Sequence, residues 1–411
     1  MTPTDPTRPD PAAQTGTESH PTSSTAQASP STATDPNAAT NTEPSTPSSL
    51  PQPQTRQVGY AVLGLGELTL DELLPAYATA GRSRLAAVVS DDRDKAVQSA
   101  LAYGLSEADA YSYDTFEDLA GRDDVQAVYI VLPNALHREY AERAARIGKH
   151  VLCEKPLAGN VEDAEAIVRA CRDAGVRLMT AYRCQYTPVH WRARDLVQGG
   201  ALGAVKLIHS VNVQVEPDEG QWRLRRDLAG GGSLLDVGLY CINTVRFLLG
   251  TEPLEVTART HSTPGDPRFT EVEESVTFQL EFPDGVLVSC SCSYGASHAR
   301  TLDVYGAEGR LSLDPAFDYT SLRLRVHTPD AVTEHRLRET DQFTLEIDHF
   351  SACIQGGRDP FTPGEEGLQD ERIMAAIYRS ARERQPVRLD EHPGRDVFRG
   401  APPERPRMER A

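Results

Sequence analysis

Between residues 57 and 182, short apolar runs alternate with amphipathic stretches, and this alternation constrains the fold more than any other feature of the 411-residue chain. The apolar runs are the expected strands, at 58–63, 85–90, 125–132, 150–154 and 177–182. Between them, the 3.6-residue spacing of apolar side chains predicts helices, at 93–103, 137–147 and 160–174. Strands and helices that alternate at this interval form a parallel sheet covered on both faces. Residues 56–182 are therefore predicted to be an α/β domain.

A glycine-containing turn, Gly64-Leu65-Gly66-Glu67-Leu68, follows the first of these strands directly. Gly64 permits a tight turn, and Gly66 lets a pyrophosphate approach the backbone donors at the start of the next helix. Thr69 stands where the third glycine of the dinucleotide fingerprint would be. Together with the alternation, the turn predicts a Rossmann domain that binds NAD or NADP.

The end of the second strand bears on the choice between the two cofactors. A fold that prefers NAD usually places an acid there, to bind the 2'-hydroxyl of the adenosine ribose. This chain has Ser90, followed by Arg93 and Lys95, and a 2'-phosphate is bound by cations and hydroxyl donors. Asp91 and Asp92 argue the other way, unless they cap the following helix. We expect NADP, with NAD as the alternative.

After residue 182 strands follow one another without intervening helices. The expected strands are at 205–215, 254–260, 275–282, 286–294, 301–305, 310–313 and 321–327, and the expected helices at 188–198, 233–249, 344–354 and 368–384. Such an order indicates a large, mostly antiparallel open sheet. Residues 183–390 are therefore predicted to be an α+β domain for substrate binding and oligomerisation.

The two ends of the chain show no apolar periodicity. Residues 1–55 contain eleven of the 29 prolines and are otherwise rich in Ser and Thr, a composition that predicts disorder. An arm that wraps a neighbouring subunit is the alternative for this segment. Residues 391–411 are polar and rich in Pro and Arg, and we expect a flexible tail.

The composition excludes several classes of function. The net charge of -18 argues against binding to nucleic acid and to anionic membranes, and no apolar stretch approaches the ~18 residues of a membrane helix. Seven cysteines without Cys-x-x-Cys spacing indicate reduced thiols, and we expect a cytoplasmic protein. The histidines show no ligand spacing, so we expect no metal.

Lys155, in the sequence Cys153-Glu154-Lys155-Pro156-Leu157, is the first candidate for chemistry. Pro156 restricts the residue before it, so Lys155 is presented at a strand's carboxyl end, where α/β sheets bind ligands. Asp236 and Tyr240 lie four residues apart in the predicted helix 233–249 and share a face. A cationic Lys155 beside the phenol would make Tyr240 a usable general base, while Asp236 orients a neighbouring hydroxyl. The set suits hydride transfer at a sugar or alcohol carbon. A solvent-exposed Lys155, a helix-start Asp236 and a core Tyr240 are the alternatives.

Four motifs resemble the Gfo/Idh/MocA oxidoreductase family over roughly residues 57–390. They are Gly64-x-Gly66, Leu132-Pro133-Asn134-x-x-His137, Glu154-Lys155-Pro156 and Asp236-x-Gly238-x-Tyr240. Longer strings are similar, nearly residue for residue, to the glucose-fructose oxidoreductase branch. They are Tyr182-Arg183-Cys184, residues 221–226, residues 230–240 and residues 363–367. The resemblance implies a Rossmann domain followed by an α+β domain, with the substrate between them.

The resemblance also implies roles for individual residues. Catalysis would involve Lys155, Asp236 and Tyr240. Contacts to the cofactor would come from Gly64, Leu65, Gly66, Glu67, Leu68, Ser90, Lys95, Leu132, Pro133, Asn134, His137, Glu154, Lys155, Arg183, Trp222 and Arg223. The substrate would contact Tyr182, Arg183, Arg223, Asp236 and Tyr240.

The expected activity is an NADP-dependent oxidation of an aldose at C1 to a lactone, with a second sugar as a possible hydride acceptor. A D-xylose or trans-dihydrodiol dehydrogenase with exchangeable NADP is the alternative, and a non-catalytic dinucleotide-binding regulator is a third hypothesis. The open face of the antiparallel sheet is the expected surface for a homo-oligomer, a dimer or a tetramer.

Overall fold

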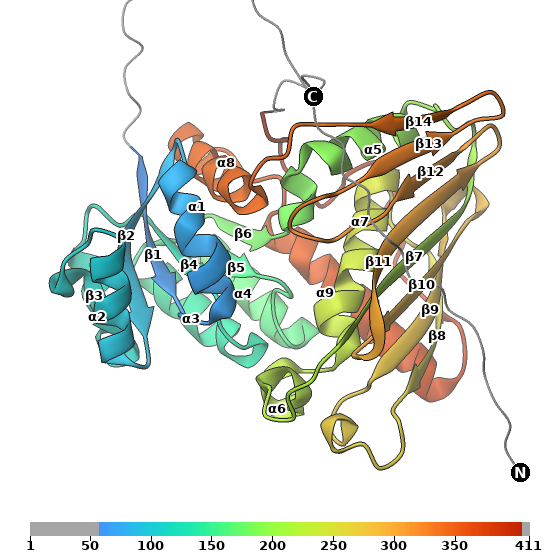
Figure 1. Cartoon of the computed structure of the whole chain (residues 1–411). Helices are drawn as coiled ribbons and strands as arrows, with labels where there is room; N and C mark the ends of the chain where they lie inside the picture. The colour runs from blue at the N-terminus through green and yellow to red at the C-terminus, as the bar shows by residue number, and fades with distance from the viewer. Residues whose placement is uncertain (1–56, 405–411) are drawn as a thin grey trace, which may run out of the picture. The chain divides into compact units, whose positions relative to one another are not determined.

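The computed structural model describes residues 57–404, which are built around two β-sheets (Figure 1). The segment 1–55, predicted to be disordered, lies outside the described residues. The first sheet belongs to the N-terminal part of the described chain and the second to the C-terminal part. This is the predicted order, a Rossmann domain followed by an α+β domain with a large sheet.

The first sheet has six parallel strands in the order β3-β2-β1-β4-β5-β6. Their bounds are β1 Val58–Leu63, β2 Ser83–Ser90, β3 Ala110–Ser112, β4 Ala127–Ile130, β5 His150–Glu154 and β6 Leu178–Ala181. Residues of β1, β4 and β6 are buried throughout, because helices cover both faces of the sheet. The sequence analysis missed β3, which has three residues, two of them only half-buried, and so lacks an apolar run.

Helices from both ends of the described chain cover this sheet. They are α1 Leu74–Thr79, which continues a π-helical turn at Thr69–Leu73, α2 Arg93–Ala102, α3 Asn134–Arg146, α4 Val161–Asp173 and α8 Gln342–Gly356. Apolar side chains of α3 and α4 pack on one face, and those of α1, α2 and α8 on the other. The later domain thus contributes α8 to the core of the earlier one.

The second sheet has nine strands in the order β14-β13-β12-β11-β7-β10-β9-β8-β15. Their bounds are β7 Val205–Val215, β8 Glu255–His261, β9 Ser275–Phe282, β10 Val286–Ser293, β11 Gly295–Gly306, β12 Arg310–Leu313, β13 Leu324–His327, β14 Val332–His335 and β15 Val387–Arg388. Only β7 and β10 pair in parallel, so the prediction of a mostly antiparallel sheet is confirmed.

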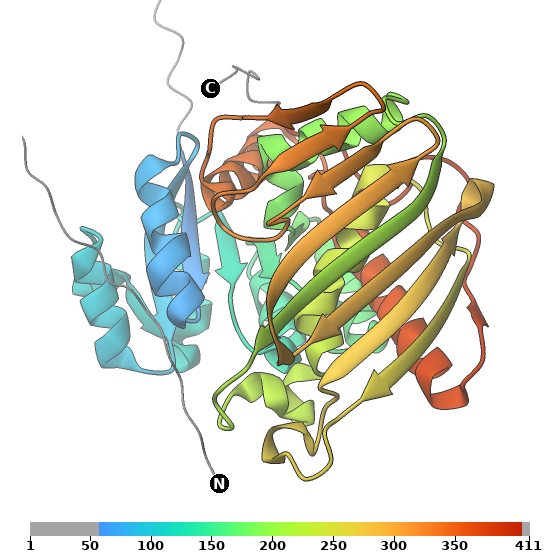
Figure 2. The same cartoon turned by 45° about the vertical axis from the view of Figure 1, so that its right-hand side comes forward.

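One face of the second sheet packs on helices, and the other is turned outward (Figure 2). The remaining helices are α5 Pro188–Gln198, α6 Arg226–Ala229, α7 Leu239–Leu249 and α9 Gly364–Glu383. The stretch Arg226–Leu249 is long and apolar enough to cross a membrane, but 83% of its apolar window is buried inside the protein. Its burial identifies it as a core helix.

The C-terminal segment differs from the predicted flexible tail over part of its length. Residues 391–404 are described, and Arg399 forms a buried ion pair with Glu366. The Asp396 carboxylate forms an ion pair with Arg194, and the backbone amide of Asp396 donates to the carbonyl of Gly250. Charged residues in a polar, proline-rich segment therefore anchor it to α5, α7 and α9, which composition could not reveal. Residues 405–411 lie beyond the described part.

Candidate active site

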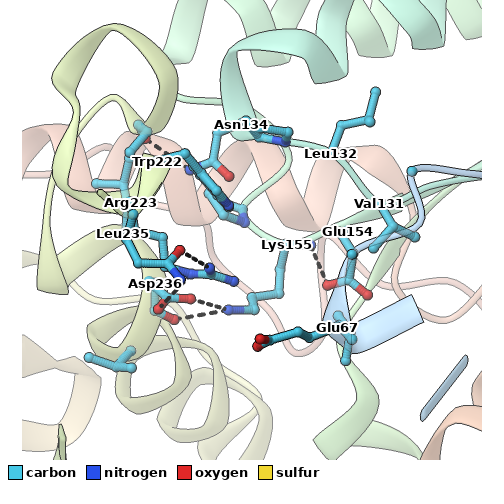
Figure 3. A pocket seen from close by; sticks show the side chains of 18 of the residues that line it. Glu67, Val131, Leu132, Asn134, Glu154, Lys155, Trp222, Arg223, Leu235 and Asp236 are labelled. Carbon is cyan, nitrogen blue, oxygen red and sulfur yellow. Dashed lines mark hydrogen bonds and ion pairs between the residues drawn. The ribbon is translucent and has the colours of Figure 1, made fainter. Parts of the chain in front are cut away.

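A cavity of about 1040 Å³ lies at the carboxyl ends of the Rossmann strands and is shared with the second domain. The loop after β1 and the ends of β2 and β5 line one half of it. The other half is lined by residues of β7, by Tyr294 after β10 and by the segment 221–240. Figure 3 shows Trp222, Arg223 and Asp236 of that segment. This is the edge of an α/β sheet where ligands bind, as predicted.

The loop after β1 fits a pyrophosphate. Gly64 has a φ of +96°, and a Cβ there would lie 2.1 Å from the carbonyl oxygen of Val131. Around a Cβ on Gly66, by contrast, there is open space, and Gly66 lines the cavity. Thr69 bonds the carbonyl of Gly64 at 2.7 Å, so the residue in place of the third glycine secures the turn. These features fit a dinucleotide at the start of the π-helical turn Thr69–Leu73 that leads into α1.

At the end of β2, the two acids have different positions. Asp92 caps α2 by accepting from the amide of Lys95 at 3.1 Å, as one reading of the sequence required. Asp91 lines the cavity together with Ser90 and Lys95, and accepts from the amide of Asp92 and the hydroxyl of Ser90. At the end of β2 the cavity is therefore lined by the hydroxyl of Ser90, the ammonium of Lys95 and the carboxylate of Asp91.

Lys155 extends from the end of β5 to Asp236 on the opposite side of the cavity (Figure 3). Its Nζ donates to Oδ1 of Asp236 at 2.9 Å and to the Asp236 carbonyl at 3.1 Å. The other carboxylate oxygen, Oδ2, accepts from the hydroxyl of Tyr294 at 2.8 Å and lies 3.4 Å from Nε of Arg223. Both carboxylate oxygens are thus engaged, and Asp236 is positioned to orient Lys155.

The charges of this pair reinforce each other. Burial opposes ionisation of Lys155, but Asp236 and Tyr240 outweigh it and raise the lysine pKa above its ordinary value. Burial likewise opposes ionisation of Asp236, but Lys155 and Arg223 lower its pKa well below the usual range. Lys155 is consequently an ammonium, and Asp236 a carboxylate, at any working pH.

Tyr240 is flanked by two cations. The Lys155 ammonium lies 4.7 Å from the ring centroid, and the Arg183 guanidinium lies 4.9 Å from it. Nε of Arg183 donates to the Tyr240 hydroxyl at 3.2 Å. The sequence analysis expected Lys155 beside that hydroxyl; it faces the ring instead, and Arg183 contacts the oxygen. The ring of Tyr319 packs on Arg183 at 4.4 Å.

Glu154 lies next to Lys155 and faces a second buried carboxyl group. The Tyr129 hydroxyl is 2.7 Å from Oε1 of Glu154 and 3.4 Å from Oε2 of Glu346. Burial raises the pKa of both glutamates, and the Glu154 carboxyl raises the pKa of Glu346 further. Burial and both carboxyls raise the pKa of Tyr129. The amide of Lys155 donates to the other oxygen of Glu154, which lines the cavity.

Most of the residues that the sequence predicted line this cavity. They are Gly64, Leu65, Gly66, Glu67, Leu68, Ser90, Lys95, Leu132, Pro133, Asn134, Glu154, Lys155, Arg183, Trp222, Arg223, Asp236 and Tyr240. They come from both domains, so the fold brings together groups up to about 180 positions apart in the numbering.

Two predicted residues are not part of the lining. His137 is fully buried, and its ring nitrogens contact the carbonyls of Leu132 and Pro156. His137 therefore links the loop at Leu132 to the loop at Pro156 without lining the cavity. Tyr182 is also buried, and the nearby carboxyls of Asp370 and Glu366 help burial to raise its pKa. Its side chain packs in the apolar core beneath the second sheet.

The sequence analysis missed polar residues that the second sheet contributes. They are Asn212, Gln214 and Glu216 of β7 and its end, Tyr294 after β10, Arg300 of β11 and Tyr319. Nothing in the order of these strands along the chain indicates which one faces the cavity. The alternation of polar residues 212, 214 and 216 in a predicted strand was the one available signal.

Two family models match the chain. Residues 58–182 match the oxidoreductase family with an NAD-binding Rossmann fold, and residues 190–312 match the GFO/IDH/MocA C-terminal domain. Together these matches cover both halves of the cavity.

Three individual proteins indicate the range of the relatives. D-xylose 1-dehydrogenase [NADP(+)] of Haloarcula marismortui is 34% identical over 81% of this chain and 93% of its own. A dTDP-3,4-didehydro-2,6-dideoxy-α-D-glucose 3-reductase of Streptomyces violaceoruber is 33% identical over 79% and 93%. The crystal structure of aldose-aldose oxidoreductase from Caulobacter crescentus, complexed with glycerol, is 42% identical with a TM-score of 0.79, over 81% of this chain and all of that one.

Proposed function

We propose that this chain, which belongs to the Gfo/Idh/MocA oxidoreductase family and is an NAD(P)-dependent sugar oxidoreductase, oxidises an aldose at C1 to the lactone with NADP. The observation that carries the proposal is the Tyr240 hydroxyl, held by Arg183 beside the Lys155–Asp236 pair in the cavity that fits the dinucleotide. The resemblance to glucose-fructose oxidoreductase, and the similarity to an aldose-aldose oxidoreductase, support a second sugar as the hydride acceptor.

The protein's part in this reaction is to position the sugar and to handle one proton. Bound NADP would supply the acceptor for the hydride of C1. Tyr240 is the general base for the proton of the C1 hydroxyl, and Nε of Arg183 holds the phenolic oxygen in place by a hydrogen bond of 3.2 Å. Asp236 fixes Lys155, whose ammonium donates to the reacting oxygen and orients it. In the reverse direction, toward an acceptor sugar, Tyr240 returns the proton.

The cavity supports a neutral sugar over a nucleotide-linked one. Its lining contains three arginines. Arg183 is engaged by the Tyr240 hydroxyl, the Gln342 side chain and the Phe317 carbonyl. The other two each face a carboxylate, because Arg223 lies 3.4 Å from Asp236 and Arg300 is 2.8 Å from Asp318. Glu216 and Asp218 add negative charge to the same lining. A diphosphate there would meet more carboxylates than uncompensated cations, whereas sugar hydroxyls bind both kinds of group.

Incubation with NADP and a panel of aldoses tests this proposal. We expect absorbance of the reduced cofactor together with lactone formation from neutral aldoses, and no oxidation of dTDP-linked sugars. Turnover of a dTDP-linked sugar alone would contradict the choice of substrate. Absence of turnover with every sugar, despite binding of NADP, would favour the non-catalytic regulator.

We propose NADP over NAD because Ser90 and Lys95 line the cavity where the 2'-phosphate would lie. Replacing Lys95 by Ala should raise the Kd for NADP about tenfold and leave that for NAD within twofold, since one charge-assisted bond to phosphate is lost. The matched control is Arg93→Ala, whose side chain donates to the carbonyl of Glu107 instead. Equal losses for both cofactors, measured by calorimetry, would contradict the assignment.

A D-xylose dehydrogenase with exchangeable NADP is the second candidate, favoured by the 34% identity to such an enzyme. The two candidates differ in how firmly the cofactor is retained. Denaturing the freshly purified protein should release stoichiometric nicotinamide from a sugar–sugar oxidoreductase and almost none from an exchanging dehydrogenase.

We also propose a homo-oligomer and a cytoplasmic location. The outward face of the second sheet supports the first, with Leu207 of β7 and Leu287 of β10 exposed by 41% and 53% on paired strands. The seven cysteines, all buried and free, support the second. Light scattering, before and after introducing Leu287→Glu, tests the interface, and cell fractionation tests the location.

A further inference from the structure

Asp236 lies in a π-helical turn, Leu234–Gly238, that continues directly into α7, where Tyr240 lies. A run of three glycines, Gly230-Gly231-Gly232, precedes this helix. Helix starts leave amide hydrogens without partners, and a side chain of the first residues usually binds them. Here Ser233 forms no such bond, and its hydroxyl lies 3.6 Å from the Cys292 thiol instead. The amides must therefore be bound from elsewhere in the chain.

Glu273, in the segment between β8 and β9, supplies the missing acceptor. Its Oε2 accepts from the amide of Gly232 at 2.9 Å, and its Oε1 accepts from the amide of Leu234 at 3.1 Å. The hydroxyl of Tyr378, on α9, donates to the same Oε1 at 2.9 Å. A carboxylate 39 residues away in the chain is thus the cap of this helix, and three donors hold it in place.

The glycines make this approach possible. A Cβ on Gly232 would lie 2.1 Å from the Glu273 carbonyl oxygen, and one on Gly231 would lie 2.1 Å from the Tyr378 hydroxyl. A side chain at either position would push away one of the two groups that form the cap. The space that Glu273 and Tyr378 occupy therefore accounts for glycine at positions 231 and 232.

We propose that Glu273, held by Tyr378, is a positioning residue that sets the helix bearing Asp236 and Tyr240 in register with Lys155; this inference rests on the proposed function. Asp236 follows the capped amide of Leu234 by two residues, so a shift of the helix start moves its carboxylate directly. The Lys155–Asp236 bond of 2.9 Å joins the two domains and depends on that register. Displacements of about 1 Å in such sites cost up to a hundredfold in rate.

The test compares Glu273→Gln with Glu274→Gln, the same change one residue along. Glu274 accepts from Thr263, away from the helix, and is the matched control. In Glu273→Gln an amide group replaces one acceptor, so the amides of Gly232 and Leu234 should exchange hydrogen at least about tenfold faster. We expect kcat/KM for the aldose to fall about tenfold, with its KM raised about threefold and the KM for NADP unchanged.

The KM values separate positioning from a loss of folded enzyme, because an inactive fraction lowers the apparent kcat and changes neither KM. Should Glu273→Gln fail to fold, Tyr378→Phe removes one donor and keeps the carboxylate, with an expected twofold rise in the KM for the aldose. Faster exchange with both KM values unchanged would overturn the inference, as would exchange equal to that of Glu274→Gln. Hydrogen exchange needs no substrate, so a wild-type protein inactive on every aldose would refute the proposed function separately.

Discussion

Asp236 and Asp370 are two largely buried aspartates that contact cations, and their pKa values are shifted in opposite directions. Asp236 lies in the cavity with Lys155 and Arg223, and its pKa is lowered despite burial. Asp370 is fully buried against Arg246, and burial, with Glu366 nearby, raises its pKa to about 6.

The difference follows from counting the charges. Around Asp236 two cations and the Tyr294 hydroxyl serve one carboxylate. In the second cluster Arg246 contacts Glu252, Glu366 and Asp370, and Arg399 adds one more cation through Glu366. Arg399 also pairs with Asp396, which contacts Arg194, so four carboxylates share three arginines there. One negative charge is in excess, and a proton on Asp370 below its pKa balances the cluster. Two buried ionic clusters can therefore serve different ends: one fixes the Lys155 ammonium in the cavity, and the other joins α7, α9 and the C-terminal segment.

The largest expected effect is that of Lys155→Ala on turnover. Loss of the ammonium should lower kcat/KM for the aldose by roughly 10⁴-fold, because the reacting oxygen loses its donor and Asp236 its main partner. Binding of NADP should change by less than about threefold, and the exposed Lys206→Ala is the control. Steady-state kinetics and calorimetry measure the two quantities. Undiminished turnover would remove Lys155 from the site.

Arg246→Met should act on stability instead. It leaves three buried carboxylates without their shared cation, which costs about 3 to 5 kcal/mol of unfolding free energy. Arg138, on the surface of α3, pairs with Glu142 and Asp163 and is 42% exposed, so Arg138→Met should cost less than about 1 kcal/mol. Urea unfolding compares the two variants. Equal losses would show that burial does not distinguish these ion pairs.

The residues of these two clusters show which parts of the site local sequence patterns predict and which parts depend on packing between distant segments. The alternation of strands and helices located the sheet edge, and local motifs located Lys155, Asp236 and Tyr240, because each signal lies within a few residues. The chain order does not indicate that Arg183, and not Lys155, contacts the Tyr240 hydroxyl, since that depends on how two domains pack. Arg300 and Tyr294 were missed for the same reason. Arg246 stood within an apolar helix pattern, where a lone charge signals a buried partner, but its partners on α9 lie over 100 residues away.

The smallest effect that separates the clusters is the pH dependence of stability contributed by Asp370. Its pKa in the folded protein, about 6, exceeds the ordinary 3.8, so the folded state binds more protons between these values. The contribution of Asp370 to stability is therefore fully present below about pH 4 and is lost as the pH rises through 6. The shift corresponds to roughly 2 to 3 kcal/mol.

Asp370→Asn mimics the protonated form and should lack this dependence. Urea unfolding at pH 4, 6 and 8 should show the wild type losing stability relative to Asp370→Asn as the pH rises. The opposite trend is expected for Asp236→Asn: the lowered pKa of Asp236 contributes stability above pH 3.8, so the wild type should be the more stable of that pair at pH 6 and 8. Parallel curves for the two variants would mean that both aspartates are ionised in the folded protein at these pH values, which would contradict the raised pKa of Asp370.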